Sequence, residues 1–257
     1  MSIVLNEYEW AESALSSDDL GKKPIETLTR VAKYYIASGY STDESRKLTE
    51  SFLLRCDPTA SLVLWSQRLD YVMSRAAKCP IIQIESIRIT ESEMVAIKAI
   101  PKRQTARLAF VLLCVSKYWD VVNPNNNHWV NERDTDLMRM ANVNTSIRRQ
   151  SAMFAELREL GLIKFSNRVD NLNVQVLFTD DDPPVVLDVR DFRNLGYLYL
   201  KYLGESYIEC ACCGLVVRSE AKTGRKKKYC DVCATKKRIE QNVNSVMKIR
   251  AQRKDRE

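Results

Sequence analysis

Apolar residues recur at helical spacing through the N-terminal part of the chain. Pro24 stands where a first helical residue is favoured, and Leu28, Val31 and Tyr35 follow on one helical face. Gly39 should end this helix, because glycine readily adopts the left-handed conformation found at helix C-termini. The same periodicity predicts two more helices, over residues 42–53 and 61–78.

The next segment changes from an extended to a helical pattern. Residues 81–89 alternate enough to predict a strand. Thr90 and Glu93 then form a capping-box pattern, which opens a helix toward Ile100. Pro101 should end this helix, since the residue before a proline disfavours the helical conformation.

Residues 103–178 show an ordered series of patterns. They predict an apolar helix over 103–119, a polar loop over 123–127 and a short strand at 129–130. A short helix, a turn and a longer helix follow, over 132–141, 142–144 and 145–161. The runs 162–165 and 172–178 flank a polar turn and predict a β-hairpin. Helix, short helix, turn, long helix and hairpin, in that order, resemble the winged helix-turn-helix fold.

The longer helix is the predicted recognition helix of this middle unit. At about 100° per residue its apolar side chains share one face, expected to be buried: Ile147, Met153, Phe154, Leu157 and Leu160. The other face carries Arg148, Arg149, Ala152 and Ala155. A helix-turn-helix docks the N-terminal part of its second helix against base edges, where Arg148 and Arg149 can pair with guanine. Thr145 and Ser146 stand beside them and can bond phosphate.

A second interpretation of this helix stays open. Exposed arginines often form only a solvated helix face. Glu156 and Glu159 follow on the same side and would repel phosphates. Residues 103–178 hold 10 basic and 7 acidic side chains, which is only a small excess. Winged helices also serve as protein-docking modules, so contact with a protein is the alternative.

Five of the eight cysteines crowd into the C-terminal part of the chain. Cys210 with Cys213, and Cys230 with Cys233, form two C-x-x-C pairs separated by 16 residues, a spacing typical of structural zinc sites. Four thiolates complete a tetrahedral shell and leave no position for a catalytic water. Cys212 could replace a neighbouring ligand, because the first half reads C-x-C-C. A redox C-x-x-C is the alternative chemistry, which the two matched pairs disfavour.

The other cysteines and the chain's start bear on its compartment. Cys56, Cys79 and Cys114 stand singly among apolar residues and are expected to be buried, inert thiols. No run of about 18 apolar residues predicts a membrane span, and the first residues lack the cationic segment of a signal peptide. We therefore expect a cytoplasmic protein, where reduced thiols favour metal binding over disulfides.

The net charge of +7 lies entirely at the C-terminal end. Residues 201–257 hold 15 Lys and Arg against 7 Asp and Glu, whereas residues 1–200 hold 25 against 26. This excess predicts an acidic partner, most often nucleic acid, bound with an affinity that falls as salt rises. The expected phosphate contacts are Lys222, Arg225, Lys226, Lys227, Lys228, Lys236, Lys237 and Arg238. A solubilising terminus, or one that binds an acidic host protein, is the alternative.

No constellation of residues predicts an enzyme. The acids of residues 180–184 are adjacent on a proline-containing stretch and should point in different directions, so we expect a solvated linker. His128 is the only histidine and lacks the partners of a catalytic triad, so a structural role is expected. A glycine-rich phosphate loop is also absent from the sequence.

The chain as a whole resembles uncharacterised proteins of phages and mobile elements from Gram-positive bacteria. The resemblance is carried by residues 123–127, residues 191–197 and the cysteine segment. It implies a DNA-associated phage or regulatory role in a bacterial cytoplasm. The leading hypothesis is a regulator or replication-associated protein that binds nucleic acid, most readily double-stranded DNA. The rival hypothesis is a module that binds a host replication, transcription or defence protein.

These patterns together predict a mainly α fold with small β elements. The expected parts are a helical N-terminal region (1–100), a winged-helix domain (101–179), a linker and helix (180–204), a zinc ribbon (205–237) and a basic helical tail (238–257). The zinc ion is the expected cofactor, and it would be structural because all its ligands are protein thiolates.

Overall fold

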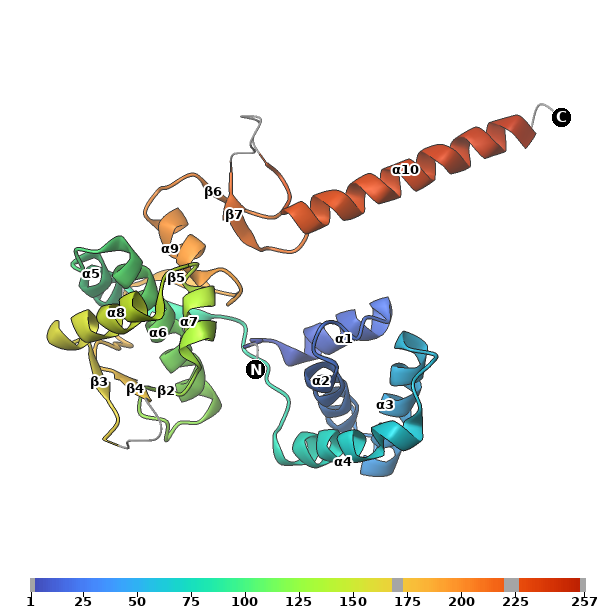
Figure 1. Cartoon of the computed structure of the whole chain (residues 1–257), viewed down its shortest axis with the longest axis horizontal. Coiled ribbons are helices and arrows are strands. Elements are labelled where there is room, and N and C mark those ends of the chain that lie inside the picture. The colour runs from blue at the N-terminus through green and yellow to red at the C-terminus, as the bar shows by residue number, and fades with distance from the viewer. Residues whose placement is uncertain (1–2, 168–172, 220–226, 255–257) are drawn as a thin grey trace. The chain divides into compact units, whose positions relative to one another are not determined.

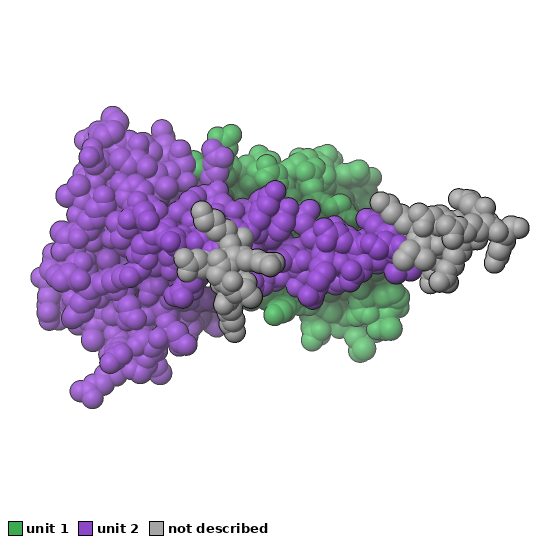
Figure 2. Space-filling view, turned by 90° about the horizontal axis from the view of Figure 1, so that it is seen from above, with its two compact units in different colours: residues 1–87 green, residues 88–257 purple. Residues whose placement is uncertain are grey.

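The computed structural model describes residues 3–167, 173–219 and 227–254. The described chain is mainly helical with small sheets, which confirms the predicted fold class at this level. It divides into two compact units, Met1–Ile87 and Arg88–Glu257, coloured separately in Figure 2. Residues 88–100 therefore belong to the second unit, whereas the sequence analysis placed them in the N-terminal region (1–100). Within the described ranges, no helix has the length and apolar character needed to cross a membrane.

The described part of the first unit is built from helices (Figure 1). They are α1 (Glu7–Ser17), α2 (Pro24–Ala37), α3 (Thr42–Cys56) and α4 (Leu62–Lys78). Pro24 begins α2 as predicted, and Ser41 with Glu44 forms the capping box that begins α3. The sequence pattern did not single out α1, whose buried residues are Glu7 and two alanines. The core gathers apolar side chains from all of these helices, including Ala14, Leu28, Val31, Phe52, Leu53, Leu69 and Val72.

A buried ion cluster connects α1, α2 and the segment after α4. Glu7 is only 4% exposed, and its carboxylate accepts hydrogen bonds from Lys33 at 2.9 Å and Arg30 at 3.4 Å. The Ile82 N–H donates to the same carboxylate at 3.2 Å, and the Glu7 N–H donates to the Ile82 carbonyl at 2.8 Å. Removing a charge from water costs several kcal/mol unless partners of this kind compensate it. Glu7 is thus a structural residue of the first unit.

The second unit begins with β1 (Ile87–Thr90), α5 (Glu91–Lys98) and α6 (Arg103–Val122). The strand predicted over residues 81–89 forms only from Ile87 onward, where it pairs with β5 (Val185–Val189). The sequence did not predict β5, which falls in the expected linker. Thr90 and Glu93 form the predicted capping box. Helix α6 buries residues on all sides, because α5, α7, α8, α9 and strands β2 and β4 surround it.

A second buried ion cluster holds the acidic segment that follows β4. Glu93 is fully buried, and its carboxylate accepts hydrogen bonds from Lys117 Nζ at 2.8 Å and the Asp180 N–H at 2.9 Å. Lys117 also donates to the Asp180 carbonyl at 3.0 Å and pairs with the Asp181 carboxylate at 3.0 Å. The expectation of a solvated linker is therefore wrong at Asp180. The buried Glu93–Lys117 ion pair needs further hydrogen bonds, and the N–H and carbonyl groups of Asp180 supply them.

The middle elements are β2 (Trp129–Val130), α7 (Asp134–Met140), α8 (Ile147–Glu159), β3 (Ile163–Phe165) and β4 (Val174–Val176). Strand β4 lies between β2 and β3 and is antiparallel to both. The predicted hairpin is thus confirmed, and β2 adds to it as an edge strand. The sheet buries Val130, Ile163, Val174 and Val176, and it contacts α6 through β2 and β4.

The polar loop between α6 and β2 is organised by Asp120. Its carboxylate accepts hydrogen bonds from the His128 N–H at 2.8 Å and the Asn126 side chain at 3.0 Å. The His128 Nδ1 atom lies 2.6 Å from the second carboxylate oxygen. These contacts agree with a structural role for His128.

The chain continues through α9 (Leu195–Tyr202), β6 (Tyr207–Glu209), β7 (Val216–Arg218) and α10 (Asp231–Lys254). Strands β6 and β7 form an antiparallel hairpin. Helix α9 contacts α6 and also both strands of this hairpin, so it links the hairpin to the core of the second unit. Helix α10 begins at the second cysteine pair, seven residues before the predicted start of the tail at 238.

Candidate metal centre and nucleic-acid interface

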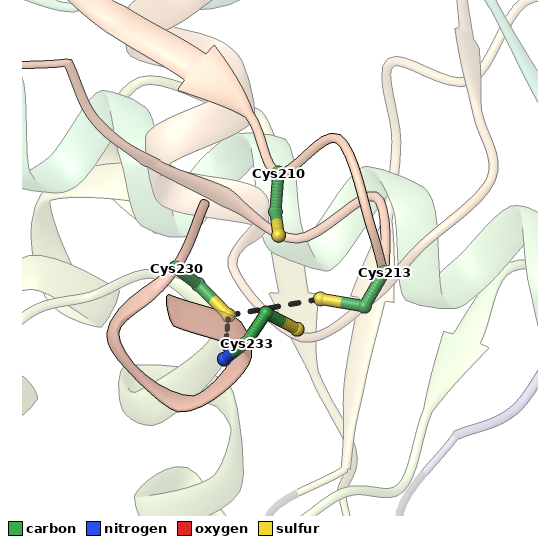
Figure 3. Close-up of side chains that lie close together, drawn as sticks. All are labelled: Cys210, Cys213, Cys230 and Cys233. Atoms are coloured by element: carbon green, nitrogen blue, oxygen red, sulfur yellow. Dashed lines mark hydrogen bonds between the residues drawn. The ribbon is translucent and has the colours of Figure 1, made fainter. Parts of the chain in front are cut away.

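The four predicted ligand cysteines come together in the second unit (Figure 3). The sulfurs of Cys210, Cys213, Cys230 and Cys233 all lie within 4.8 Å of one another, and three of these residues are buried. Cys212 is exposed and stands outside this group. The spacing of the two C-x-x-C pairs thus predicted which four cysteines come together.

The four sulfurs are close enough together to surround one ion, and one of their separations has the value expected for a tetrahedral site. Metal–sulfur bonds of about 2.3 Å, as zinc forms, require sulfur–sulfur separations of about 3.8 Å in a regular tetrahedron. The Cys213 and Cys230 sulfurs are 3.8 Å apart. The cluster could therefore hold a metal ion through four thiolates. Such a shell is closed, because no ligand position is left for water or substrate.

Two different local structures supply the two cysteine pairs. Cys210 and Cys213 lie in the tight turn between β6 and β7, where the Gly214 N–H donates to the Cys210 carbonyl at 2.9 Å. Gly214 has a φ of +71°, which suits glycine because it lacks a Cβ. Cys230 precedes α10, and Cys233 lies in its first turn, where its N–H points at the Cys230 sulfur at 3.5 Å. Tyr229 lies in a bend and not in a strand, and this half of the site opens helix α10.

Burial and hydrogen bonding shift the pKa values of Cys210, Cys213 and Cys233 in different directions. Burial raises the pKa of Cys210, but backbone hydrogen bonds from Cys230, Cys212 and Cys213 together lower it to about 6. Burial raises the pKa of Cys213, and hydrogen bonding to Cys230 and Cys213 raises that of Cys233. The Cys210 thiol therefore loses its proton more readily than those of Cys213 and Cys233.

The first cysteine pair is anchored to the preceding segment by Arg193 and Asn194. Arg193 forms a two-pronged ion pair with Asp191 and donates to the Cys213 carbonyl at 2.6 Å. The Asn194 side chain donates to the Val216 carbonyl at 2.8 Å. Both bonds hold backbone groups next to the cysteine turn, so they fix the orientation of a potential ligand pair.

The same segment also contacts the turn between α7 and α8. The Asn142 side chain donates to the Asn194 side chain and accepts from the Tyr197 N–H, each at 3.1 Å. At Gly196 the backbones are so close that an added Cβ would lie 1.9 Å from the Ala141 carbonyl oxygen. Residues 193–197 therefore join the cysteine cluster to the turn between α7 and α8. The sequence pattern did not predict these contacts, and residues 191–197 entered the sequence analysis only as part of a resemblance.

The structure places the predicted recognition residues at an exposed helix end. Ser146 is the N-cap residue of α8, and its side chain forms no cap hydrogen bond. Arg148 and Arg149 are exposed and form no ion pair with any residue in the described ranges. Met153, Phe154 and Leu157 are buried as predicted. The prediction is wrong for Ile147 and Leu160, which are 80% and 47% exposed because they lie beyond the packed turns of α8.

Glu156 does not face solvent beside the arginines. Its carboxylate accepts a hydrogen bond from Thr105 at 2.8 Å and pairs with Lys102 at 3.2 Å. The side chain therefore points toward the start of α6 and is only 18% exposed. The expected repulsion of phosphates by Glu156 is thereby reduced. Glu159 is exposed, so the repulsion expected from its carboxylate remains.

The predicted basic residues of the C-terminal part have different surroundings. Lys222, Arg225 and Lys226 lie outside the described residues. Lys227 pairs with Asp231 at 2.9 Å. The ammonium groups of Lys228 and Lys237 lie 5.8 and 5.2 Å from the centre of the Tyr229 ring. Lys236 and Arg238 are exposed on α10.

The three remaining cysteines differ in exposure. Cys114 is fully buried, and burial raises its pKa well above the usual value, so its thiol should be inert as predicted. Cys56 is half-buried. The prediction is wrong for Cys79, which is exposed because it stands at the C-cap of α4, where the packed helix ends.

The fold and the site thus define a mainly helical protein with a four-cysteine cluster that could hold a metal ion. Comparison with protein-family models, curated proteins and solved structures finds no match.

Proposed function

We propose that this protein binds double-stranded DNA through a winged-helix unit and a zinc-stabilised basic ribbon. One observation carries the proposal: α6, β2, α7, α8, β3 and β4 follow one another in the order of a winged helix, with their strands in one antiparallel sheet. The N-terminal end of α8 is exposed. In such proteins this end of the second helix meets base edges in the major groove. Arg148 and Arg149 occupy that position.

The cysteine cluster would hold a structural zinc ion. Four thiolates favour zinc among the common divalent ions, and the small ribbon has few apolar residues of its own to stabilise it. The ion would fix the β6–β7 hairpin to the start of α10. The basic residues on either side would then form phosphate contacts on a rigid support.

The biological role we propose is regulation or replication of DNA, in a phage or mobile element of a Gram-positive bacterium. This part of the proposal depends on the sequence resemblance. The salt dependence of binding would support the electrostatic part, because each neutralised phosphate releases counterions.

The test is a mobility-shift or anisotropy titration with duplex DNA at low salt. Replacing both recognition arginines (Arg148→Glu, Arg149→Glu) should abolish site-specific binding. A double variant with the same charge change elsewhere (Arg88→Glu, Arg190→Glu) is the matched control, since both residues are exposed in the second unit. Equal weakening in the two variants would show that only net charge matters. Unchanged binding in the Arg148/Arg149 variant would assign α8 to another partner.

The second candidate function is protein binding, and exposed apolar side chains favour it. Ile147 is 80% exposed beside the two arginines, and Val63 and Leu64 of α4 are 85% and 80% exposed. Val63 and Leu64 are neighbours on one helix, and contiguous exposed apolar side chains often mark protein-docking sites. If duplex and single-stranded nucleic acids both fail to bind at low salt, a host replication, transcription or defence protein becomes the better class of partner.

A further inference from the structure

The β2–β4–β3 sheet (Figure 1) carries a surface pocket of about 460 Å³. Trp129 of β2 and Lys164 of β3 both stand opposite Gln175 of β4, and directly opposed residues share one face of a sheet. Residues that alternate with them, such as Val174, are buried on the other face, toward α6. The pocket therefore lies on the outer face of the sheet. Its lining residues are Trp129, Lys164, Phe165, Ser166, Asn167 and Asn173.

Trp129 supplies the flat apolar surface of this pocket. Its N–H donates to the Asn126 carbonyl at 3.3 Å, and its carbonyl accepts from the Asn126 side chain at 2.9 Å, so its backbone is held on both sides. Phe165 stands opposite Val174, on the buried side, and the Arg158 guanidinium carbon lies 5.7 Å from the centre of its ring. The half-buried indole of Trp129 is thus the aromatic group that a ligand can reach.

The polar groups of the pocket surround this indole. Lys164 is exposed and forms no ion pair with any residue in the described part of the chain. The Ser166 N–H donates to the Asn173 carbonyl at 2.9 Å, which extends the β3–β4 ladder and places both side chains on the face of Lys164. The amide of Asn173 can donate and accept hydrogen bonds. No acidic residue is among the described residues that line the pocket.

An aromatic surface, an amide and an unpaired cation together fit one nucleotide of a single strand. Bases stack on aromatic side chains, and hydrogen bonds to amides recognise their edges, while a lysine attracts the phosphate. In a duplex both flat faces of a base are covered by its neighbours, so the indole can stack only on an unpaired base. Trp129 and Lys164 lie two strands apart, about 10 Å, so a base and a nearby phosphate can reach them together.

We propose that this pocket binds one unpaired base of a single-stranded nucleic acid. Trp129 stacks on the base, Asn173 bonds to its edge, and Lys164 pairs with its phosphate. The inference goes beyond duplex binding through α8 and does not rest on it, because Arg148 and Arg149 do not line the pocket.

Two labelled probes of equal length and charge separate base stacking from charge. They are a short oligothymidylate and an abasic oligonucleotide, each titrated by anisotropy against the full-length, metal-loaded protein. The wild type should bind the oligothymidylate more tightly by about 5- to 150-fold, the range for one base stacked on an aromatic ring. Trp129→Ala should reduce this ratio to nearly one, whereas Trp129→Phe should keep most of it. Tyr71→Ala, at an exposed aromatic residue of the first unit, is the matched control and should keep the full ratio.

Indole fluorescence tests the same contact with Trp129 in place, so it does not depend on how well Trp129→Ala folds. In a Trp10→Phe, Trp65→Phe background, only Trp119 and Trp129 emit. The oligothymidylate should quench this emission and the abasic probe should not. Adding Trp129→Phe should remove the quenching, since the Trp119 indole N–H is buried.

The phosphate contact of Lys164 has its own measurement. In Lys164→Ala, the slope of log affinity against log salt for the oligothymidylate should become shallower by about 0.7, the amount for one phosphate of a single strand. Lys78→Ala, at an exposed lysine of the first unit, should keep the wild-type slope.

The outcomes separate this pocket from the proposed duplex site. Equal wild-type affinities for the two probes overturn the inference, and so does a preference for bases that survives Trp129→Ala. Competition by unlabelled duplex DNA that equals competition by single strands also overturns it. If duplex DNA fails to bind but the preference for bases depends on Trp129, the proposed function fails and the pocket stands.

Discussion

Gly196 lets α9 pack directly against the end of α7, and an alanine there would test this contact. A Cβ at residue 196 would lie 1.9 Å from the Ala141 carbonyl oxygen and 2.4 Å from its carbonyl carbon. Close carbon–oxygen contacts are ordinarily about 3.3 Å, so the two segments would have to separate by about 1.4 Å. Since the clashing atoms belong to the backbone, no side-chain rotation can relieve the overlap.

Helix propensity and packing predict opposite signs for this substitution. Within a helix, alanine is favoured over glycine by about 0.8–1.0 kcal/mol. Overpacking a well-packed core costs about 1–3 kcal/mol. Separation would also weaken the hydrogen bonds of Asn142 to Asn194 and Tyr197, each worth about 1 kcal/mol. We expect Gly196→Ala to lower the free energy of unfolding of the second unit by about 2 kcal/mol.

Urea unfolding of the metal-loaded full chain measures this loss. The two compact units can unfold separately, so the probe must report the second one. With Trp10→Phe and Trp65→Phe in the background, fluorescence comes only from Trp119 and Trp129, both in the second unit.

An exposed alanine on α8 provides the control. Ala152→Gly should lower the free energy of unfolding by about 1 kcal/mol. The Ala152 side chain is exposed, so only the lower helix propensity of glycine contributes. If Gly196→Ala raised stability by a similar amount, the close approach of α9 to Ala141 would be refuted. The link between the cysteine cluster and the α7–α8 turn would then lose its main support.

Two further predictions concern the metal and the first unit. Cys233→Ser should bind well under one zinc per chain by elemental analysis and should lose the structure of the ribbon, whereas Cys212→Ser, outside the cluster, should keep about one zinc per chain. Full zinc content in Cys233→Ser would contradict the ligand set. Glu7→Gln removes the carboxylate shared by two buried cations and should destabilise the first unit by about 3–5 kcal/mol in urea unfolding. Glu9 is exposed on the same helix, so Glu9→Gln should change the free energy of unfolding by less than about 0.5 kcal/mol. Equal effects of the two substitutions would show that the buried Glu7 carboxylate does not stabilise the unit.

Local patterns in the sequence were enough to predict most of the helices, the β3–β4 hairpin and the four cysteines of the cluster. Pro24, the Thr90–Glu93 capping box and the apolar periodicity act within a few residues, so their consequences can be read from neighbours in the chain. The same holds for the two C-x-x-C pairs, because four thiolates at matched spacing have one common structural use. These features concern which elements form and which side chains are available.

Tertiary contacts decided how those elements meet. Asp180 lies on a linker by its sequence, but it binds a Glu93–Lys117 pair that is more than 60 residues away in the chain. Glu156 turns away from the arginines because Thr105 and Lys102 offer it partners on another helix. The Gly196 backbone lies against Ala141, which stands 55 residues earlier in the chain. Local periodicity carries no information about such partners, since a buried polar group is satisfied by whatever the fold brings within reach.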